Sequence, residues 1–423
     1  MEPLILLSAR GSDRATAYLS SNKIIRKERR LFVGWLDGPE VAGGPERIQL
    51  GVCDAGSGAL VSAYCLGEGI DNHCGPAITM DREGRLHAIL GAHSGVFAYR
   101  WSDEPESLAS WSPPELLGPY DTYPSLVVDG AGTLHLLSRE SGAHPRKLIY
   151  RRRFQGRGWE EPIPIALSPR PGYTNFMHSL SVGPEGRLHL TFQYHYLTHG
   201  VSPADAVARL AAWITSDDGG DTWHQEGEKI SLPLCLETTR GFLAAPDGGI
   251  RLSNHVVDSK GRLWIFSSSP ERRGGILFRR DEEGWTEIDT EQSLGTLDNR
   301  DGREISLSRD ASGLIHLVIG TVPGGLAGTW KDPRHELFHL VLEESGKQHD
   351  FHQLTNFGQA SWLPSLENWN WFQPACTDTP WMLFTREKNG NSPTDVFLTK
   401  LQREPSHGRV PDTHQNSTSQ KPL

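Results

Sequence analysis

A short phrase recurs five times along this chain of 423 residues, in DREGRLHAI from Asp81, DGAGTLHLL from Asp129, GPEGRLHLT from Gly183, DSKGRLWIF from Asp258 and DASGLIHLV from Asp310. Each copy reads as a tight turn with glycine in fourth place, followed by the alternating apolar residues of a strand. The turn glycines are spaced 48, 54, 75 and 52 residues apart. Repeats of this length with several strands each are typical of propeller blades. The sequence therefore predicts an all-β propeller.

Two further strand pairs lack the phrase, RLFVGWLD with RIQLGVCDA near the N-terminus and TPWMLFTR with DVFLTKLQ near the C-terminus. Together with the five copies they predict seven four-stranded blades, while the 75-residue interval leaves six or eight open. The segment LILLSA at residues 4–9 is expected to complete the last blade and close the ring. We expect one propeller domain over residues 1–403 and a disordered tail over 404–423, which is polar and rich in proline and serine.

Charge and composition exclude several classes of partner. The net charge is −10 and there is no long basic block, which argues against nucleic acid. The apolar runs are too short to span a membrane. The five cysteines have no metal-like spacing and are interpreted as buried thiols. Met1 is followed by no recognisable secretory signal, so the compartment stays undetermined, and we expect a monomer.

Two hairpins carry polar residues at their open ends. His73 and His93 stand twenty residues apart in NHCGPAITMDREGRLHAILGAH, and Tyr123 and Arg139 stand sixteen apart in DTYPSLVVDGAGTLHLLSR. An antiparallel hairpin returns the chain to its starting point, so residues at its open ends become neighbours. Two adjacent hairpins of this design would bring two imidazoles, a phenol and a guanidinium together. Such a set can remove a proton from a carbon atom beside a carboxylate.

Most of the other histidines are expected to serve the blades. A histidine that recurs in the repeated phrase is a structural residue, and this applies to His87, His135, His189 and His316. A structural zinc or calcium ion is an open alternative, since imidazole ligates zinc. Its candidate ligands are His144, His195 and His199.

The paired spacings resemble those of the seven-bladed propeller polysaccharide lyases, a group that contains ulvan lyases and rhamnosyl-glucuronate lyases acting on gum arabic side chains. The resemblance covers nearly the whole of residues 1–403, and its specific part is His73, His93, Tyr123 and Arg139 in consecutive blades. It implies that these four residues line a cleft for an anionic, uronic-acid-containing polysaccharide. It also implies β-elimination at a rhamnosyl-α-1,4-glucuronate linkage, giving a 4,5-unsaturated uronic acid, and a secreted or periplasmic protein.

The chemistry of such a lyase assigns provisional roles and requires no cofactor. Arg139 would neutralise the substrate carboxylate and stabilise the anion that forms after proton loss. Either His73 or His93 would take the C5 proton, while the other orients it or holds the substrate. Tyr123 would donate a proton to the departing oxygen, or would act as the base if a neighbouring arginine lowers its pKa.

Further residues at strand ends and in loops are candidates for binding sugar hydroxyls or a sulfate, or else are turn and cap residues. They are Asn72, Asn175, Arg240, Asn254 and His255.

Two alternative functions remain open. The segment SDDGGDTWHQ, Ser216 to Gln225, matches the Asp-box pattern and resembles the outer hairpin turns of sialidases. A sialidase-type glycoside hydrolase would need an arginine triad, for which Arg139, Arg240 and Arg386 are available, but no R-[IL]-P phrase occurs near the N-terminus. The predicted funnel positions hold His, Tyr and Arg where a hydrolase would need two carboxylates. A non-catalytic carbohydrate-binding propeller would not need the paired spacings.

Overall fold

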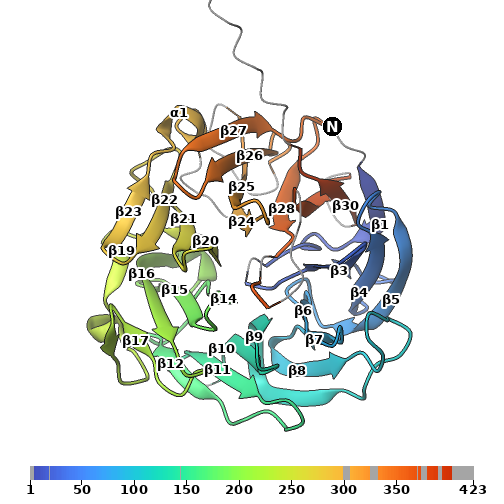
Figure 1. Ribbon diagram of the computed structural model, residues 1–423, viewed down its shortest axis with the longest axis horizontal. Helices are drawn as coiled ribbons and strands as arrows, with labels where there is room; N and C mark the ends of the chain where they lie inside the picture. The colour runs from blue at the N-terminus through green and yellow to red at the C-terminus, as the bar shows by residue number, and fades with distance from the viewer. Residues whose placement is uncertain are drawn as a thin grey trace, which may run out of the picture.

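The computed structural model describes residues 4–18, 20–142, 144–298, 305–323, 332–368, 370–372, 379–388 and 393–402. In this part of the chain, strands follow one another around a ring, and the first strand lies beside the last (Figure 1). Helical structure here is limited to α1 (Glu291–Leu294) and to 3-10 turns at Pro203–Asp205 and Leu236–Thr238. The all-β, propeller-like prediction is confirmed. The predicted tail at 404–423 lies outside the described residues.

The described strands form five hydrogen-bonded sheets. The first contains β28 (Ser361–Leu366), β29 (Trp381–Arg386), β30 (Thr394–Lys400), β1 (Ile5–Gly11), β2 (Ile24–Lys27), β3 (Arg30–Asp37), β4 (Glu46–Asp54) and β5 (Leu60–Gly69). The second contains β6 (Ala77–Met80), β7 (Leu86–Leu90), β8 (His93–Trp101), β9 (Glu115–Val128), β10 (Leu134–Glu140), β11 (Lys147–Arg153) and β12 (Ile163–Leu167).

The third sheet contains β13 (Thr174–Asn175), β14 (Ser179–Val182), β15 (Leu188–Leu197), β16 (Ala206–Ser216), β17 (His224–Gln225), β18 (Glu228–Lys229) and β19 (Gly241–Ala244). The fourth contains β20 (Arg251–Val257), β21 (Leu263–Ser268), β22 (Ile276–Asp281) and β23 (Gly284–Ile288). The fifth contains β24 (Ile305–Arg309), β25 (Leu314–Thr321), β26 (Glu336–Glu343) and β27 (Gln348–Gln353). All strand pairs in these sheets are antiparallel, as tight hairpin connections require.

The ring is closed by the N-terminal strand. β1 pairs with β30, with Ile5 opposite Leu398 and Gly11 opposite Thr394. Leu7 on this strand is 8% exposed and packs with Trp381 and Leu398, while its neighbour Leu6 is 49% exposed. The predicted closing role of residues 4–9 is therefore confirmed, and closure leaves no free edge at this joint.

The repeated phrase forms the turn between the first two strands of a unit. Its glycines lie between β6 and β7, β9 and β10, β14 and β15, β20 and β21, and β24 and β25. All five have a positive φ, between 75° and 87°, which a side chain would strain. The turn prediction is confirmed at all five positions: Gly84, Gly132, Gly186, Gly261 and Gly313.

The aspartate and histidine of the phrase hold the turn onto the sheet. Asp129 Oδ1 accepts hydrogen bonds from the backbone N–H groups of Ala131 and Thr133 at 2.9 and 2.8 Å. Asp129 Oδ2 lies 3.2 Å from His135 Nε2, and His135 Nδ1 lies 2.6 Å from the hydroxyl of Tyr150 on the next strand. The Asp81–His87 and Asp310–His316 pairs repeat the contact at 3.2 and 3.1 Å.

Two copies of the phrase differ in sequence and lack the contact between aspartate and histidine. Trp264 replaces the histidine in the fourth sheet, and its Nε1 donates to Asp258 Oδ2 at 2.9 Å. Gly183 replaces the aspartate in the third sheet, and His189 there is buried with an Nδ1 that hydrogen-bonds to none of the described residues. The histidines of the phrase serve the blades, as predicted.

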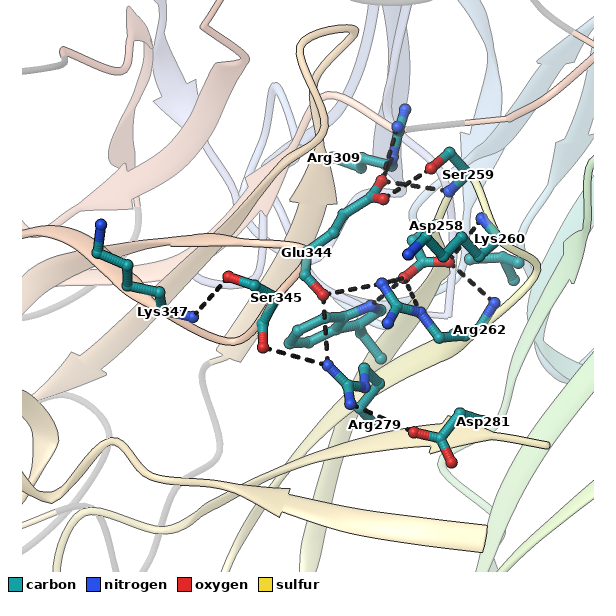
Figure 2. Close-up of polar contacts among 12 residues, drawn as sticks. Asp258, Ser259, Lys260, Arg262, Arg279, Asp281, Arg309, Glu344, Ser345 and Lys347 are labelled. Atoms are coloured by element: carbon teal, nitrogen blue, oxygen red, sulfur yellow. Dashed lines mark hydrogen bonds and ion pairs between the residues drawn. The ribbon is translucent and has the colours of Figure 1, made fainter. Parts of the chain in front are cut away.

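The fourth and fifth sheets are joined by side chains around one carboxylate (Figure 2). Glu344, in the turn between β26 and β27, accepts from Arg309 Nε at 2.8 Å and from Ser259 Oγ at 2.7 Å. Its backbone carbonyl accepts from Arg262 at 2.8 Å and from Arg279 at 3.3 Å. These bonds fasten the turn after β20 to the turn after β26. An apolar cluster that includes Trp264, Leu277 and Leu317 fills the space between the same two sheets.

The 75-residue interval is taken up by the third sheet, where β15 and β16 are long and β17, β18 and β19 are added. The Asp box forms the turn from β16 to β17. Asp218 Oδ1 accepts from Ser216 Oγ and from the Thr222 N–H, both at 2.8 Å. Burial raises the pKa of Asp218. These two hydrogen bonds and a third, donated by Thr222 Oγ1, outweigh burial and lower the pKa to about 2. Trp223 is buried beneath the turn.

Among the described residues, no helix has the length and apolar character needed to cross a membrane. Within the same residues the cysteines are free thiols, namely Cys53, Cys65, Cys74 and Cys235. Cys376 lies outside the described residues.

Candidate active site

The structure brings the residues of the two hairpins into one cluster. The rings of His73 and His93 are stacked with their centroids 4.1 Å apart, and the centroid of Tyr123 lies 6.3 Å from that of His73. The guanidinium carbon of Arg139 lies 4.7 Å from the Tyr123 ring centroid. Four side chains that are up to 66 residues apart in the sequence therefore share one site.

The sheet register explains this convergence. Thr122 in β9 is opposite His93 of β8 on one side and opposite Arg139 of β10 on the other. The three residues thus form a row across neighbouring strands, and the hairpin of β6 and β7 returns His73 to the same end. Tyr123 follows this row with φ of +59°, a conformation that bulky residues rarely adopt. The hairpin prediction places Tyr123 at the end of a strand. In the structure Tyr123 lies within β9, which begins at Glu115 and continues through the bend.

Asp71 holds both imidazoles and was not among the predicted site residues. Its Oδ1 accepts from the His73 N–H at 2.8 Å and lies 3.2 Å from His73 Nδ1, while its Oδ2 lies 2.5 Å from His93 Nδ1. Burial raises the pKa of Asp71, but the hydrogen bonds from His93 and from the His73 backbone outweigh burial and keep the pKa below its usual value. The carboxylate is therefore ionised and fixes the orientation of both rings. The D-x-H spacing of residues 71–73 is the sequence signal that could have identified it.

Arg14 and Tyr18 come from the loop between β1 and β2 and were also missed. Arg14 Nη1 lies 2.9 Å from His73 Nε2 and donates to the hydroxyl of Tyr18. A guanidinium can only donate, so His73 Nε2 accepts and the ring proton of His73 lies on Nδ1, facing Asp71. Burial, together with Arg14 and His93, lowers the pKa of His73 to about 4. His73 is consequently neutral at neutral pH, with its lone pair occupied by Arg14.

His93 differs from His73 in one respect. Its Nδ1 is engaged by Asp71, and none of the described residues hydrogen-bonds to its Nε2. The side chain is 31% exposed. When Nδ1 donates to the Asp71 carboxylate, the lone pair on Nε2 faces outward.

The two phenols lie beside the imidazoles and keep their protons. The ring centroids of Tyr18 and Tyr123 are 4.6 Å apart. Burial, and then Tyr173, raises the pKa of Tyr123 to about 12 despite the nearby Arg139 and Arg14. Burial likewise raises the pKa of Tyr18 well above its ordinary value. Both groups are proton donors at neutral pH.

From the sequence, Arg139 is expected to line the cleft and to neutralise the substrate carboxylate, but the structure buries this side chain. Its side chain is 1% exposed, and Nη1 donates to the carbonyl of Thr174 at 3.1 Å. The guanidinium lies against the rings of Tyr123 and Tyr173, at 4.7 and 5.6 Å from their centroids. The guanidinium is therefore buried, because the side chain of Arg139 on β10 packs against these two rings. The guanidinium presented beside the imidazoles is that of Arg14.

A cavity opens next to the phenols, which we call the central cavity. Tyr18, Tyr123, Asn175 and His178 contribute to its wall, together with residues of β20 and β28. β9, β14, β20 and β28 all lie around the middle of the ring (Figure 1). His178 Nε2 lies 2.8 Å from the carbonyl of Tyr123 and supports the strained backbone there.

The five predicted binding residues are distributed over different places. Asn175 lines the central cavity, and Asn72 donates to Asp13 at 2.7 Å next to His73. Arg240 lies by the outer strand β17, where its backbone N–H and carbonyl bond to Gln225.

Asn254 and His255 occupy structural positions between sheets. Asn254 exchanges two hydrogen bonds of 2.8 Å with the backbone of Leu307, which ties β20 to β24. His255 is buried between Ser181 Oγ and Thr191 Oγ1, at 2.7 and 2.8 Å.

The predicted metal ligands do not gather. His195 Nε2 lies 2.9 Å from the carbonyl of Ala206, and His199 Nδ1 lies 3.0 Å from Thr198 Oγ1. Among the described residues, the group of three potential ligands within 4.8 Å of one another is Asp71, His73 and His93, and His144 is not part of it. The donor set of this group fits zinc, but the Arg14 guanidinium 2.9 Å from His73 opposes a cation there.

The chain is similar in sequence to a protein family and to several known proteins. The family model described as "BNR repeat-containing family member" matches residues 47–293, more than half of the chain. An ulvan lyase of Nonlabens ulvanivorans is 23% identical over 194 residues, which cover 40% of this chain and 41% of that protein. The ulvan lyase PL25 of Pseudoalteromonas sp. (strain PLSV) is 22% identical over 235 residues, covering 48% of this chain and 44% of that protein. The matches thus span less than half the length of these relatives.

Solved structures match over nearly the whole chain. A PL25 ulvan lyase bound to -[GlcA(1-4)Rha3S]- has a TM-score of 0.70 at 15% identity, covering 94% of this chain and 96% of that one. The polysaccharide lyase Uly1 has a TM-score of 0.58 at 12% identity, covering 95% and 99%. At these identities the likeness concerns the fold. The family match, which covers more than half of the sequence, shows that the chain belongs to the BNR repeat-containing family.

Proposed function

We propose that this protein is a polysaccharide lyase that cleaves a rhamnosyl-α-1,4-glucuronate linkage by β-elimination. The observation that carries the proposal is the Asp71–His73–His93 cluster. None of the described residues hydrogen-bonds to His93 Nε2 there, and a guanidinium and two protonated phenols lie beside the imidazoles. The names of the curated relatives, both ulvan lyases, support it. The substrate is an anionic polysaccharide or oligosaccharide that contains a uronic acid.

We also propose seven blades. The first sheet divides at the single pairing of Gly11 with Asp37, and the second divides within β9, which pairs with β8 in its first half and with β10 in its second. Each of these two sheets then gives two units, and the third, fourth and fifth sheets give one each.

His93 is the base in this proposal. Its Nε2 accepts no hydrogen bond from the described part of the chain, and Asp71 on Nδ1 stabilises the imidazolium that forms when the C5 proton is taken. The lone pair of His73 is occupied by Arg14, so His73 holds that guanidinium in place. A positioned base of this kind contributes about 10²–10⁴-fold in rate.

Arg14 neutralises the substrate carboxylate. The C5 proton is weakly acidic while the adjacent carboxylate is ionised, and a guanidinium stabilises the charge that develops after proton loss. Arg14 lies next to His73, whereas Arg139 is buried and bonded to Thr174. Arg139 contributes by keeping the Tyr123 ring in place from behind.

The phenols supply the proton for the leaving group. Tyr123, with a pKa of about 12, is a phenol at neutral pH and donates to the departing O4 oxygen. Tyr18 lies next to Tyr123, with ring centroids 4.6 Å apart, and is placed to return a proton to that phenol after each turnover.

A sialidase-type hydrolase is the second candidate function, and the Asp box is the observation that favours it. Its arginine triad, however, would have to form from residues that lie apart. Arg139 contacts Tyr123, Arg240 lies beside Gln225, and Arg386 pairs with Asp395 at 3.4 Å.

The test is digestion of rhamnose–glucuronate oligosaccharides by the purified protein, followed by ultraviolet absorbance. Elimination creates a double bond conjugated with the carboxylate and absorbs, whereas hydrolysis and mere binding do not. Absorbance that rises with the wild-type protein and not with His93→Gln supports the proposal. Saturated products alone would refute it.

A further inference from the structure

The central cavity borders the two phenols but not the His73–His93 pair. Tyr18 and Tyr123 are part of its wall, while Arg14, His73 and His93 are not. In the proposed reaction the phenol donates to the oxygen that leaves, and the sugar on that oxygen must lie beyond the phenol. The central cavity is therefore the space next to the leaving sugar.

The wall of this cavity is electrically neutral. None of the described residues that line it is Asp, Glu, Lys or Arg. His178 lines it as well, but burial lowers the pKa of its imidazole to about 4 and keeps it uncharged. An anionic group placed here would lose its hydration without gaining a charged partner, which is unfavourable.

The cavity is lined by apolar and by uncharged polar side chains. Met177, Leu252, Leu363 and Pro364 form the apolar part. On the polar part, Asn175 Oδ1 accepts from the Met177 N–H at 3.0 Å, and its Nδ2 contacts none of the described residues. Such a mixed wall suits a sugar that carries a methyl group as well as hydroxyls.

The nearby arginines are turned to other partners, and Arg14, which donates to Tyr18 and lies beside His73, is the one assigned to the substrate carboxylate. Arg139 donates to Thr174 and packs on Tyr123. Arg251 lies behind the wall, with Nη1 3.7 Å from Met177 Sδ and 3.3 Å from His195 Nδ1. A sulfate on the bound sugar would meet the neutral wall before either cation.

Resting on the proposed function, we propose that the central cavity holds the leaving sugar as an uncharged 6-deoxyhexose and that the protein discriminates against a sulfate ester on it. The preferred substrate is then an unsulfated rhamnosyl-glucuronate unit rather than one whose rhamnose carries sulfate.

The experiment compares two oligosaccharides that differ only in a sulfate on the leaving rhamnose. We expect kcat/KM for the unsulfated one to be higher by at least about 10-fold, because a buried unpaired charge is costly. Free rhamnose should inhibit more strongly than rhamnose sulfate in the same assay. Equal cleavage, or a preference for the sulfated substrate, overturns this inference and leaves the proposed lyase function intact. Cleavage of neither substrate overturns the proposed function, and this inference with it.

A pair of variants at Met177 tests the origin of the preference. Met177→Lys places a cation at the wall and should narrow the ratio of the two kcat/KM values by roughly 10-fold. Met177→Leu keeps the wall neutral at the same backbone position and should keep the wild-type ratio, whatever its effect on the rate. A ratio that Met177→Lys leaves unchanged, in protein with a normal melting temperature, contradicts the assignment of the cavity.

Discussion

At the scale of single residues, the two histidines of the site differ in what their outward nitrogens face. His73 Nε2 accepts from Arg14, whereas His93 Nε2 has no partner among the described residues. His93→Gln should therefore reduce kcat/KM by about 10²–10⁴-fold. His73→Gln should reduce it less, because Gln can still accept from Arg14. Initial rates of unsaturated product formation decide the order, and a larger loss in His73→Gln would reverse our assignment of the base.

Asp71 acts through the histidines and is a positioning residue. Asp71→Asn keeps the shape but loses the charge that orients both rings and stabilises the imidazolium. We expect kcat to fall by about 10²-fold or more with little change in KM. A variant that changes KM alone would show that Asp71 acts on substrate binding instead. Asp13→Asn, next to Asn72, is a control of the same chemistry outside the His pair.

Substitution of Arg14 and of Arg139 should affect activity and thermal stability differently. Arg14→Ala removes the guanidinium beside His73 and should cost about 10²–10³-fold in kcat/KM with a nearly normal melting temperature. Arg139→Ala empties a buried site behind Tyr123 and should lower the melting temperature as well as the activity. Melting curves for both variants, beside their rates, separate the roles. A destabilised Arg14→Ala with normal turnover would contradict them.

The sequence reveals part of this site because hairpin geometry is local. Each of two hairpins carries one pair of site residues at its ends, and the sequence predicts the turn of each hairpin. The pairs are His73 with His93 and Tyr123 with Arg139. Arg14 and Tyr18 come from a loop of another sheet, and no spacing connects them to His73. The burial of Arg139 was not predictable either, because it depends on the bend at Tyr123 and on the Tyr173 ring.

At the scale of the element, the repeated turn is a small hydrogen-bonded unit with a charged centre. Burial raises the pKa of Asp129, but the contact with His135 and the backbone N–H groups outweigh it and lower the pKa overall. A carboxylate with a lowered pKa stabilises the fold above its unfolded pKa of about 3.9, and this stability is lost as the pH falls toward the folded value.

Asp129→Asn should lower stability by about 1–3 kcal/mol at neutral pH. The melting temperature of this variant should also fall less steeply than that of the wild type below about pH 4. Thermal melts across the acid range provide the measurement. Parallel curves for the two proteins would show that the Asp129–His135 contact is not linked to protonation.

At the scale of the whole molecule, the ring depends on a joint between the two ends of the chain. Leu7 and Leu6 are neighbours on β1, with Leu7 buried against Trp381 and Leu6 49% exposed. Leu7→Ala should cost about 2–5 kcal/mol, whereas the matched Leu6→Ala should be nearly neutral. Denaturant unfolding of both variants measures this. Equal effects would mean that the closing strand does not anchor the ring. The repeat in the sequence predicts the blades and this closure, since both follow from strand periodicity.

The central claim is elimination at a uronic acid, and the mass of the products tests it most directly. Rhamnosyl-glucuronate oligosaccharide is digested in isotopically labelled water, and the fragments are analysed by mass spectrometry. Elimination adds no water, so the account predicts an unsaturated uronate fragment without the label, absent with His93→Gln. Fragments that each carry the mass of a saturated sugar, one of them with labelled oxygen, would show hydrolysis and contradict the account.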